Sequence, residues 1–253
     1  MTQTYAPGTP NWVDLGSTDV AAAAQFYGGV FGWTLDDLGP DAGGYGIFRK
    51  DGKQVAGLGP ATDPTRGTSW STYFATDDVD DVASKVQASG GQVVLAPMDV
   101  MDQGRMAVFT DPGGVFFSAW QPGKHRGAEL VNQPGSLTWN ELATPDLDAG
   151  KTFYEQVFGL TTRDIGNEEM SYTLLEVEGR PVAGAMPAAE GMPTAWSVYF
   201  AVDDCDQVYA KALELGAQAV MPPQDSPPGR FAILVDPQGG AFAIIKNNPD
   251  FTV

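Results

Sequence analysis

Apolar and polar positions alternate near the start of the chain, which predicts a β-strand over residues 11–17. Trp12 and Asp14 fall on one face of this strand, and the residues between them fall on the other. Asp19 then precedes the alanine-rich stretch 20–27, where it is a typical helix N-cap. The helix is expected to end at the glycines that follow it or one turn later. The opening segment is therefore a strand followed by a helix.

Short apolar runs separated by turn residues follow this helix. They predict strands over residues 34–37, 44–49 and 54–59, and Lys50-Asp51-Gly52 is a hairpin signal between the last two. The same β-α-β-β-β order returns with a strand at 70–75 and a helix that starts after Asp77-Asp78 and runs to about residue 87. Its three further strands are predicted at 92–96, 105–110 and 115–121. The first half of the chain is therefore two modules of one pattern.

The second half of the chain repeats the first. Trp139 follows Trp12 by 127 residues (139 − 12), and Phe153 follows Phe26 by the same interval (153 − 26). The interval is still 125 between Arg105 and Arg230 (230 − 105), so insertions and deletions are confined to turns. Self-similarity of this kind indicates a duplicated structural unit. The sequence predicts an α+β protein of four βαβββ modules in two pairs.

Composition and charge narrow the class of protein. The 253 residues are 43% hydrophobic, which is ample for a packed core. The formal net charge is −18, and its field repels phosphate backbones and anionic lipid. We therefore expect neither a nucleic-acid partner nor a membrane partner.

Cysteine usage and the N-terminal residues bear on the compartment. Cys205 is the only cysteine and cannot form an intramolecular disulfide, which fits a reducing environment. Acidic neighbours are expected to raise the pKa of its thiol, which disfavours a nucleophilic role. Residues 1–7 have neither a basic region nor an apolar run, so no signal peptide is evident. The sequence predicts a cytoplasmic protein.

At this level of detail the chain resembles the vicinal oxygen chelate superfamily, which includes glyoxalase I, extradiol dioxygenases and bleomycin-resistance proteins. The resemblance rests on the strand before Asp19, on Asp77-Asp78 and on the turn Asp111-Pro112-Gly113-Gly114, each of which has a copy in the second half. It covers two expected domains, 9–122 and 136–247, joined by a linker over 123–135. It implies that two modules join their sheets into a cup that holds the ligand.

The resemblance also implies a divalent metal held by His, Gln or Glu on particular strands. The residues at those positions here are Trp12 and Trp139, Ser71 and Ser197, and Ser118 and Ala243. The only histidine, His125, lies in the linker. We therefore expect no metal and no cofactor, and the metal-dependent activities of the family become improbable.

The residues expected to line the cups suggest a different ligand. The aromatic and hydroxyl candidates are Trp12, Ser71, Tyr73, Ser118 and Trp120 in the first cup and Trp139, Ser197 and Tyr199 in the second. Such walls suit a flat, largely apolar organic molecule. Asp14 and Glu141 point the same way as the tryptophans and are candidate acid–base residues. The bland alternatives are that the tryptophans plug the cups and that both carboxylates only accept structural hydrogen bonds.

Two arginines and the loops before them also bear on ligand binding. Arg105 and Arg230 each start a strand, and they either clamp an anionic ligand or form surface ion pairs with the many acids. The methionine-rich loop 98–103 is more adaptable than its proline-rich counterpart 223–228, which favours the first cup for a hydrophobic ligand.

Three functions remain open from the sequence. The first is metal-independent binding of a small aromatic natural product, as in antibiotic sequestration. The second is a metal-free tailoring enzyme that acts on an aromatic polyketide-type substrate. The third is a non-catalytic interaction protein. The tandem halves are expected to act as a monomeric pseudo-dimer, with further dimerisation open. Whether modules pair within or across the halves is also left open.

Overall fold

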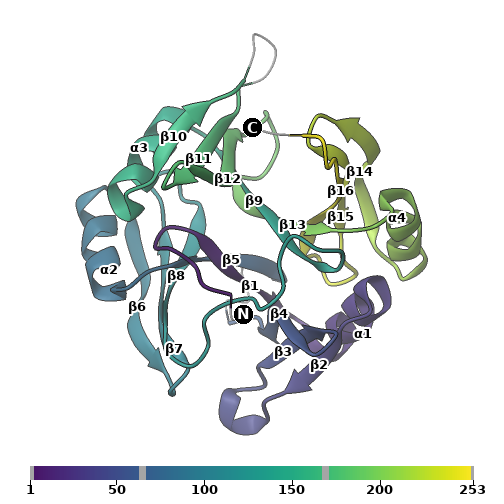
Figure 1. Ribbon diagram of the computed structural model, residues 1–253. Helices are drawn as coiled ribbons and strands as arrows, with labels where there is room; N and C mark the ends of the chain where they lie inside the picture. The colour runs from purple at the N-terminus through teal and green to yellow at the C-terminus, as the bar shows by residue number, and fades with distance from the viewer. Residues whose placement is uncertain (1–2, 63–66, 167–170, 252–253) are drawn as a thin grey trace. The chain divides into compact units, whose positions relative to one another are not determined.

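The computed structural model describes residues 3–62, 67–166 and 171–251 and contains four copies of one module (Figure 1). The first comprises β1 (Pro10–Ser17), α1 (Val20–Phe31), β2 (Thr34–Asp37), the 3₁₀ turn η1 (Pro40–Ala42), β3 (Gly46–Lys50) and β4 (Lys53–Pro60). The second comprises β5 (Ser69–Ala75), α2 (Val79–Ala88), β6 (Gln92–Val100), β7 (Gly104–Thr110) and β8 (Phe116–Pro122).

The second half of the chain supplies the third and fourth modules. The third comprises β9 (Ser136–Thr144), α3 (Leu147–Phe158), β10 (Thr161–Asp164), β11 (Thr173–Val177) and β12 (Arg180–Pro187). The fourth comprises β13 (Ala195–Ala201), α4 (Cys205–Glu214), β14 (Gln218–Ser226), β15 (Gly229–Val235) and β16 (Ala241–Asn247). The predicted α+β class and the fourfold βαβββ order are confirmed.

Each module folds its four strands in the same order. The orders are β2-β3-β4-β1, β5-β8-β7-β6, β10-β11-β12-β9 and β13-β16-β15-β14. In every module the first strand is parallel to the last, and the remaining neighbours are antiparallel hairpins. The helix supplies the crossover that lets the first strand lie parallel to the last. Each half of the chain therefore contributes eight strands.

Local sequence signals set the helix ends. The Asp19 carboxylate accepts a hydrogen bond from the Ala22 amide at 2.9 Å, and α1 ends at Gly32, which adopts a left-handed conformation with φ +70°. Asp146 and Gly159 cap α3 in the same way. The first helix thus ends one turn beyond Gly28, which is the longer of the two predicted lengths. In the described part of the chain, no helix has the length and apolar character needed to cross a bilayer.

The modules pack across the two halves of the sequence. The chain divides into two compact units, of which unit 1 comprises Met1–Asn11, Ser71–Gly127 and Trp139–Ser197. Unit 2 comprises Trp12–Trp70, Ala128–Thr138 and Val198–Val253. In unit 1, α2 contacts α3; in unit 2, α1 contacts α4. The second module therefore shares a core with the third, and the first shares one with the fourth.

Aromatic rings fill both cores. In unit 2 the Phe31 ring lies 5.2 Å from Phe200, and the Tyr27 ring lies 5.5 Å from Phe242. In unit 1 the Phe117 ring lies 5.4 Å from Tyr154. Each of these pairs joins residues from different halves of the sequence, and tilted or edge-to-face ring contacts add to the stabilisation from burial. Residues that are distant in the chain therefore contribute to the core of each unit.

A buried polar network anchors each core. In unit 2 the Trp70 indole N–H donates to the Tyr27 hydroxyl at 3.0 Å, and that hydroxyl donates to Asp236 at 2.8 Å. In unit 1 Trp196 donates to Tyr154 at 2.8 Å, and Tyr154 donates to Asp111 at 3.3 Å. Burial raises the pKa of both phenols well above the usual value, so they remain neutral donors.

The same aspartates organise the tight turns after β7 and β15. The Asp111 carboxylate accepts from the Val115 amide at 2.9 Å, and Asp236 accepts from the Gly240 amide at 2.8 Å. Burial raises the pKa of Asp111, although the hydrogen bonds from Val115 and Tyr154 oppose that shift. The Asp-Pro turns thus connect local turn geometry to the aromatic core.

Candidate functional site

A hydrogen-bonded chain joins two of the predicted site residues in unit 2. The Trp12 indole N–H donates to the Tyr45 hydroxyl at 3.2 Å, and Tyr45 donates to the Asp14 carboxylate at 3.3 Å. Trp12 and Asp14 are on β1, and Tyr45 immediately precedes β3. Alternation along β1 places both side chains on the face opposite Val13 and Leu15, which are in the core.

Unit 1 holds the same arrangement from the other half of the chain. The Trp139 indole N–H donates to the Tyr172 hydroxyl at 3.0 Å, and Tyr172 donates to Glu141 at 2.8 Å. Trp139 is partly exposed, whereas Trp12 is buried at 3% exposure. The two copies thus share their hydrogen bonds and differ in how far the indole is open to solvent.

Glycines in the neighbouring strands make room for the two tyrosines. Gly57 pairs with Asp14 across β4 and β1, and Gly184 pairs with Glu141 across β12 and β9. A Cβ atom at Gly57 would lie 1.8 Å from the Tyr45 hydroxyl oxygen, and one at Gly184 would lie 2.0 Å from that of Tyr172. Only glycine lets the phenol lie against the strand at this point. The Val-Ala-Gly triplet occurs at 55–57 and again at 182–184, and the close approach of the tyrosines explains the glycine in each copy.

We expect Gly57→Ala to expel Tyr45 from its position and to break its hydrogen bond with Asp14. The cost should be about 1–3 kcal/mol, the usual range for an overpacked site. Urea unfolding followed by circular dichroism measures it. Gly16→Ala on β1 is the matched control, because its Cβ would make only ordinary contacts, 3.5 Å from Ala61. Equal stability of the two variants would contradict the close approach of Tyr45.

Electrostatics fix the direction of these hydrogen bonds. Burial, and then the nearby Asp14 charge, raises the pKa of Tyr45 well above its usual value. Burial and the Glu141 charge act on the Tyr172 pKa in the same direction. Both phenols therefore stay protonated at neutral pH, accept from an indole and donate to a carboxylate. Each group presents an oriented indole beside a partly exposed carboxylate.

Four other predicted wall residues lie on β5 and β8 of unit 1. Tyr73 pairs with Ser118 in the strand register, and both are buried. The Trp120 indole N–H donates to the His125 carbonyl oxygen at 2.9 Å, which ties the end of β8 to the segment after it. Ser71 and Ser197 are partly buried and also belong to unit 1, whereas Tyr199 is buried in unit 2 beside Ala243.

Both candidate arginines form ion pairs with nearby acids. Arg105 contacts Asp99 at 2.7 Å and Asp80 at 2.9 Å. Arg230 contacts Asp206 at 2.6 Å and Asp225 at 3.1 Å. The sequence left two roles open for these arginines, anion binding and surface ion pairing, and the geometry shows ion pairing.

We expect Arg105→Gln and Arg230→Gln to leave the affinity for an uncharged aromatic ligand unchanged within twofold, as measured by fluorescence titration.

The residues at the family's metal positions do not suit a divalent ion. An indole N–H has no lone pair to offer, and those of Trp12 and Trp139 already donate to tyrosines. The remaining positions offer only serine hydroxyls and the Ala243 methyl group. Among residues 3–62, 67–166 and 171–251, no three His, Cys, Asp or Glu side chains are grouped as metal ligands would be. The donor set thus differs in kind from one that holds a catalytic metal.

Cys205 is buried at the start of α4. Burial, and then the Asp206 charge, raises its thiol pKa to about 11. The sequence predicted the direction of this shift but attributed it to the acids alone. Because the thiolate is the reactive form, we expect native protein at pH 8 to react far more slowly with a disulfide reagent such as DTNB than urea-unfolded protein does. Equal rates would contradict the buried placement.

Tyr45 and Tyr172 were not among the residues predicted from the sequence. Tyr45 was assigned only to the start of the strand predicted over 44–49, and no element was predicted at Tyr172. They are separated by 127 residues (172 − 45), the interval that relates Trp12 to Trp139. Alignment of the two halves at this interval would have identified them as a repeated hydroxyl near the repeated tryptophan and acid.

The structure defines a class of protein: four βαβββ modules, each with parallel first and last strands, that pack in pairs. The sequence profile of the Glyoxalase/Bleomycin resistance protein/Dioxygenase superfamily matches residues 9–118 and 133–244. The chain belongs to this superfamily, which confirms the resemblance inferred from the sequence.

Similar proteins of known name span almost the whole chain. The anthracycline biosynthesis protein DnrV of Streptomyces peucetius is 41% identical over 96% of this chain and 94% of its own length. The putative glyoxylase CFP32 of Mycobacterium bovis is 44% identical over 97% of each chain.

Solved structures with the same fold include a Mn(II)-bound glyoxalase and a dioxygenase. The Mn(II)-bound glyoxalase of Novosphingobium aromaticivorans aligns with a TM-score of 0.66 at 20% identity, over 97% of this chain and 84% of that one. The 2,2',3-trihydroxybiphenyl 1,2-dioxygenase of Sphingomonas wittichii aligns with a TM-score of 0.67 at 14% identity, over 96% of this chain and 91% of that one. At these identities the likeness is one of fold.

Proposed function

We propose that the protein binds a small, flat aromatic molecule without a metal ion, and that the Trp139–Tyr172–Glu141 group is its main contact. The observation that carries this proposal is the indole at the position where relatives of this fold would place a metal ligand. Its hydrogen bond to Tyr172 fixes the plane of the ring. An oriented, partly exposed indole is a surface on which an aromatic ring can stack, and the adjacent carboxylate can accept a hydrogen bond from a ligand hydroxyl.

The ligand class is supported by the named relatives. DnrV of Streptomyces peucetius and DauV of Streptomyces sp. strain C5 are both named anthracycline biosynthesis proteins, at 41% and 40% identity. Anthracyclines are flat polycyclic aromatics with several hydroxyl groups. The sequence favoured the first half for a hydrophobic ligand because of the methionine-rich loop. We place the main contact in the second half because Trp139 is more exposed than Trp12.

Fluorescence titration with 1,4-dihydroxyanthraquinone tests this proposal. We expect saturable quenching of tryptophan emission that a chelator leaves unchanged. Trp139→Phe should remove most of the quenching, while Trp12→Phe, the matched change in the buried copy, should retain it. A silent titration, or a Trp139→Phe variant that quenches like the unaltered protein, would overturn the proposal. A silent titration would favour the non-catalytic interaction protein.

A second function is favoured by the carboxylates. Each one accepts a hydrogen bond from a neutral phenol and is partly exposed, so it can also take a proton from a ligand hydroxyl or an acidic C–H group. A metal-free tailoring enzyme of aromatic polyketides would use Asp14 or Glu141 as its base. We expect Glu141→Gln to reduce turnover about 10²–10⁴-fold in such an enzyme, with ligand affinity little changed. Chromatography of reaction mixtures with anthraquinone-type substrates measures turnover, and unchanged turnover in this variant would exclude Glu141 as the base.

A further inference from the structure

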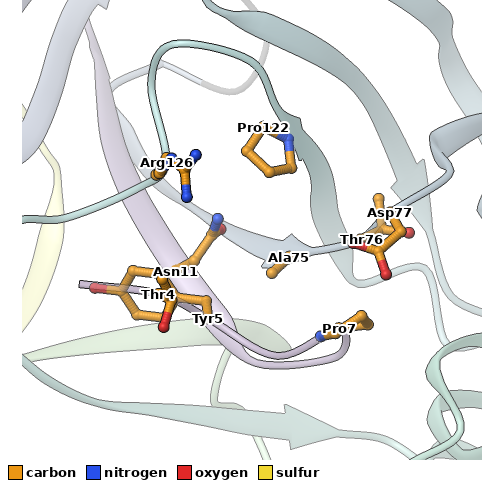
Figure 2. Close-up of a pocket in the computed structure, with 9 residues that line it drawn as sticks. All are labelled: Thr4, Tyr5, Pro7, Asn11, Ala75, Thr76, Asp77, Pro122 and Arg126. Atoms are coloured by element: carbon orange, nitrogen blue, oxygen red, sulfur yellow. The ribbon is translucent and has the colours of Figure 1, made fainter. Parts of the chain in front are cut away.

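A small pocket in unit 1 shares no lining residue with the Trp139–Tyr172–Glu141 group of the same unit. It has a volume of about 190 Å³, which is less than the ~300–1,000 Å³ of pockets for drug-sized ligands. Its walls come from the N-terminal segment, the start of β1, the end of β5 and the segment after β8 (Figure 2). Its lining residues include Asn11, Ala75, Thr76, Asp77, Pro122 and Arg126.

Asn11 is the residue that distinguishes this pocket. Its side chain is 1% exposed, and neither its Oδ1 nor its Nδ2 has a hydrogen-bond partner within the described residues. A buried amide without partners costs free energy, so such groups are rare in folded proteins. In Figure 2 the Asn11 amide is directed toward the Arg126 side chain. The amide therefore offers an NH₂ donor group and a carbonyl acceptor to whatever occupies the pocket.

The second copy of this position serves as an internal comparison. Thr138 replaces Asn11 at the equivalent point of β9, and it donates to Asn132 at 3.1 Å and accepts from Asn247 at 3.1 Å. One backbone hydrogen bond near this position occurs in both copies, because the Gly8 amide donates to the Ala75 carbonyl as the Gly135 amide donates to the Ala201 carbonyl. Among the described residues, the polar side chain is thus satisfied in one copy and unsatisfied in the other.

Opposite charges lie at the two ends of the pocket. Figure 2 shows Arg126 beside Asn11 at one end and Asp77 with Thr76 at the other, with Ala75 and Pro122 between them. Both charged side chains are exposed, and among the described residues neither forms a salt bridge, whereas Arg105 and Arg230 in the same protein are each paired with two acids. A guanidinium next to an amide N–H is suited to a carboxylate, and Asp77 is suited to an ammonium group.

We propose that this pocket binds a short zwitterion with a carboxylate at one end and an ammonium group at the other, as in an ω-amino acid. The carboxylate contacts Arg126 and the Asn11 Nδ2, and the ammonium group contacts Asp77. The methylene groups lie against Ala75 and Pro122. This site is independent of the proposed aromatic-binding site and shares no residue with the Trp139–Tyr172–Glu141 group.

Calorimetric titration of the full chain at low salt tests the proposal. The probes are 4-aminobutanoate, its homologues from three to six carbons, and butanoate and butylamine, which each carry one of the two charges. We expect one ω-amino acid to bind at least tenfold more tightly than either single-charge probe. Arg126→Gln and Asp77→Asn should each weaken that binding at least tenfold. Arg180→Gln and Asp203→Asn, the latter altering the Asp77 equivalent in the second half, should leave it unchanged.

Substitution of Asn11 separates a ligand role from a structural one. Because the amide has no partner among the described residues, Asn11→Ala should lose zwitterion binding while its denaturation midpoint without ligand stays equal or rises. A large fall in that midpoint would show that the amide is structural, which would overturn the proposal. If no ω-amino acid binds with a Kd below about 10 mM, the pocket holds only water and the proposal is overturned.

Discussion

Separate chains of residues 1–127 and 128–253 are each expected to fail to form the native fold, whereas an equimolar mixture of the two should regain it. The reason is that each compact unit takes one module from each half. In unit 2, for example, the Phe31 ring packs 5.2 Å from Phe200, which the first fragment lacks. A single half would expose the apolar face of both its helices, and it lacks the partner that buries this face.

Circular dichroism and size-exclusion chromatography of the fragments, alone and mixed, measure this effect. We expect each fragment alone to aggregate or to pair with a second copy of itself, and we expect the mixture to show the cooperative unfolding of the intact chain. A matched control is a full-length chain cleaved within the linker after folding, which should stay associated. Two monomeric fragments that each unfold cooperatively would contradict the shared cores.

Tyr27→Phe is expected to destabilise the protein by about 2 kcal/mol, because the loss of one hydroxyl leaves two buried groups without their partner. The Trp70 indole N–H loses its acceptor, and the Asp236 Oδ2 loses a donor. The shape of the ring is unchanged, so the effect reports on hydrogen bonding alone. Tyr154→Phe should behave in the same way in unit 1, through Trp196 and Asp111.

Thermal unfolding of these variants gives the measurement. A loss of about 2 kcal/mol lowers the Tm of a chain of this length by ~4–8 °C. The double variant should show the sum of the two effects, because the two networks share no residue. Tyr209→Phe on α4 is the control: Tyr209 is only partly buried, and the change should shift stability by less than ~0.5 kcal/mol. Equal Tm values for Tyr27→Phe and the control would rule out the network as a source of stability.

The helix and strand positions followed closely from local patterns. Asp78 caps α2 through hydrogen bonds from the Asp80 and Asp81 amides, as the acidic pair at 77–78 predicted. The strand predicted over 34–37 is found at β2 with the same limits. Such features depend on capping, turn residues and side-chain alternation, which act over a few residues and can be read directly from the chain.

The candidate site was predicted only in part. Alternation along β1 placed Trp12 and Asp14 on one face. The two hydrogen bonds that connect them are made by the Tyr45 hydroxyl, and Tyr45 lies 31 residues after Asp14. The sequence could not decide between anion binding and ion pairing for Arg105 and Arg230, because their partners Asp80 and Asp206 lie on neighbouring helices. Contacts between elements depend on register and packing, and no local pattern encodes them.

The sequence by itself determined the duplication and the four modules, and it has tryptophan and serine where the resemblance implies metal ligands, because these are properties of residue order. Only the tertiary structure decided that the modules share cores across the halves, since both pairings leave the same apolar faces in the sequence. It also decided that, within the part of the chain that the structure describes, the Asn11 amide has no partner while its counterpart Thr138 has two. Hydrogen-bond satisfaction is settled by which distant groups meet, and folding brings together groups that the chain keeps apart.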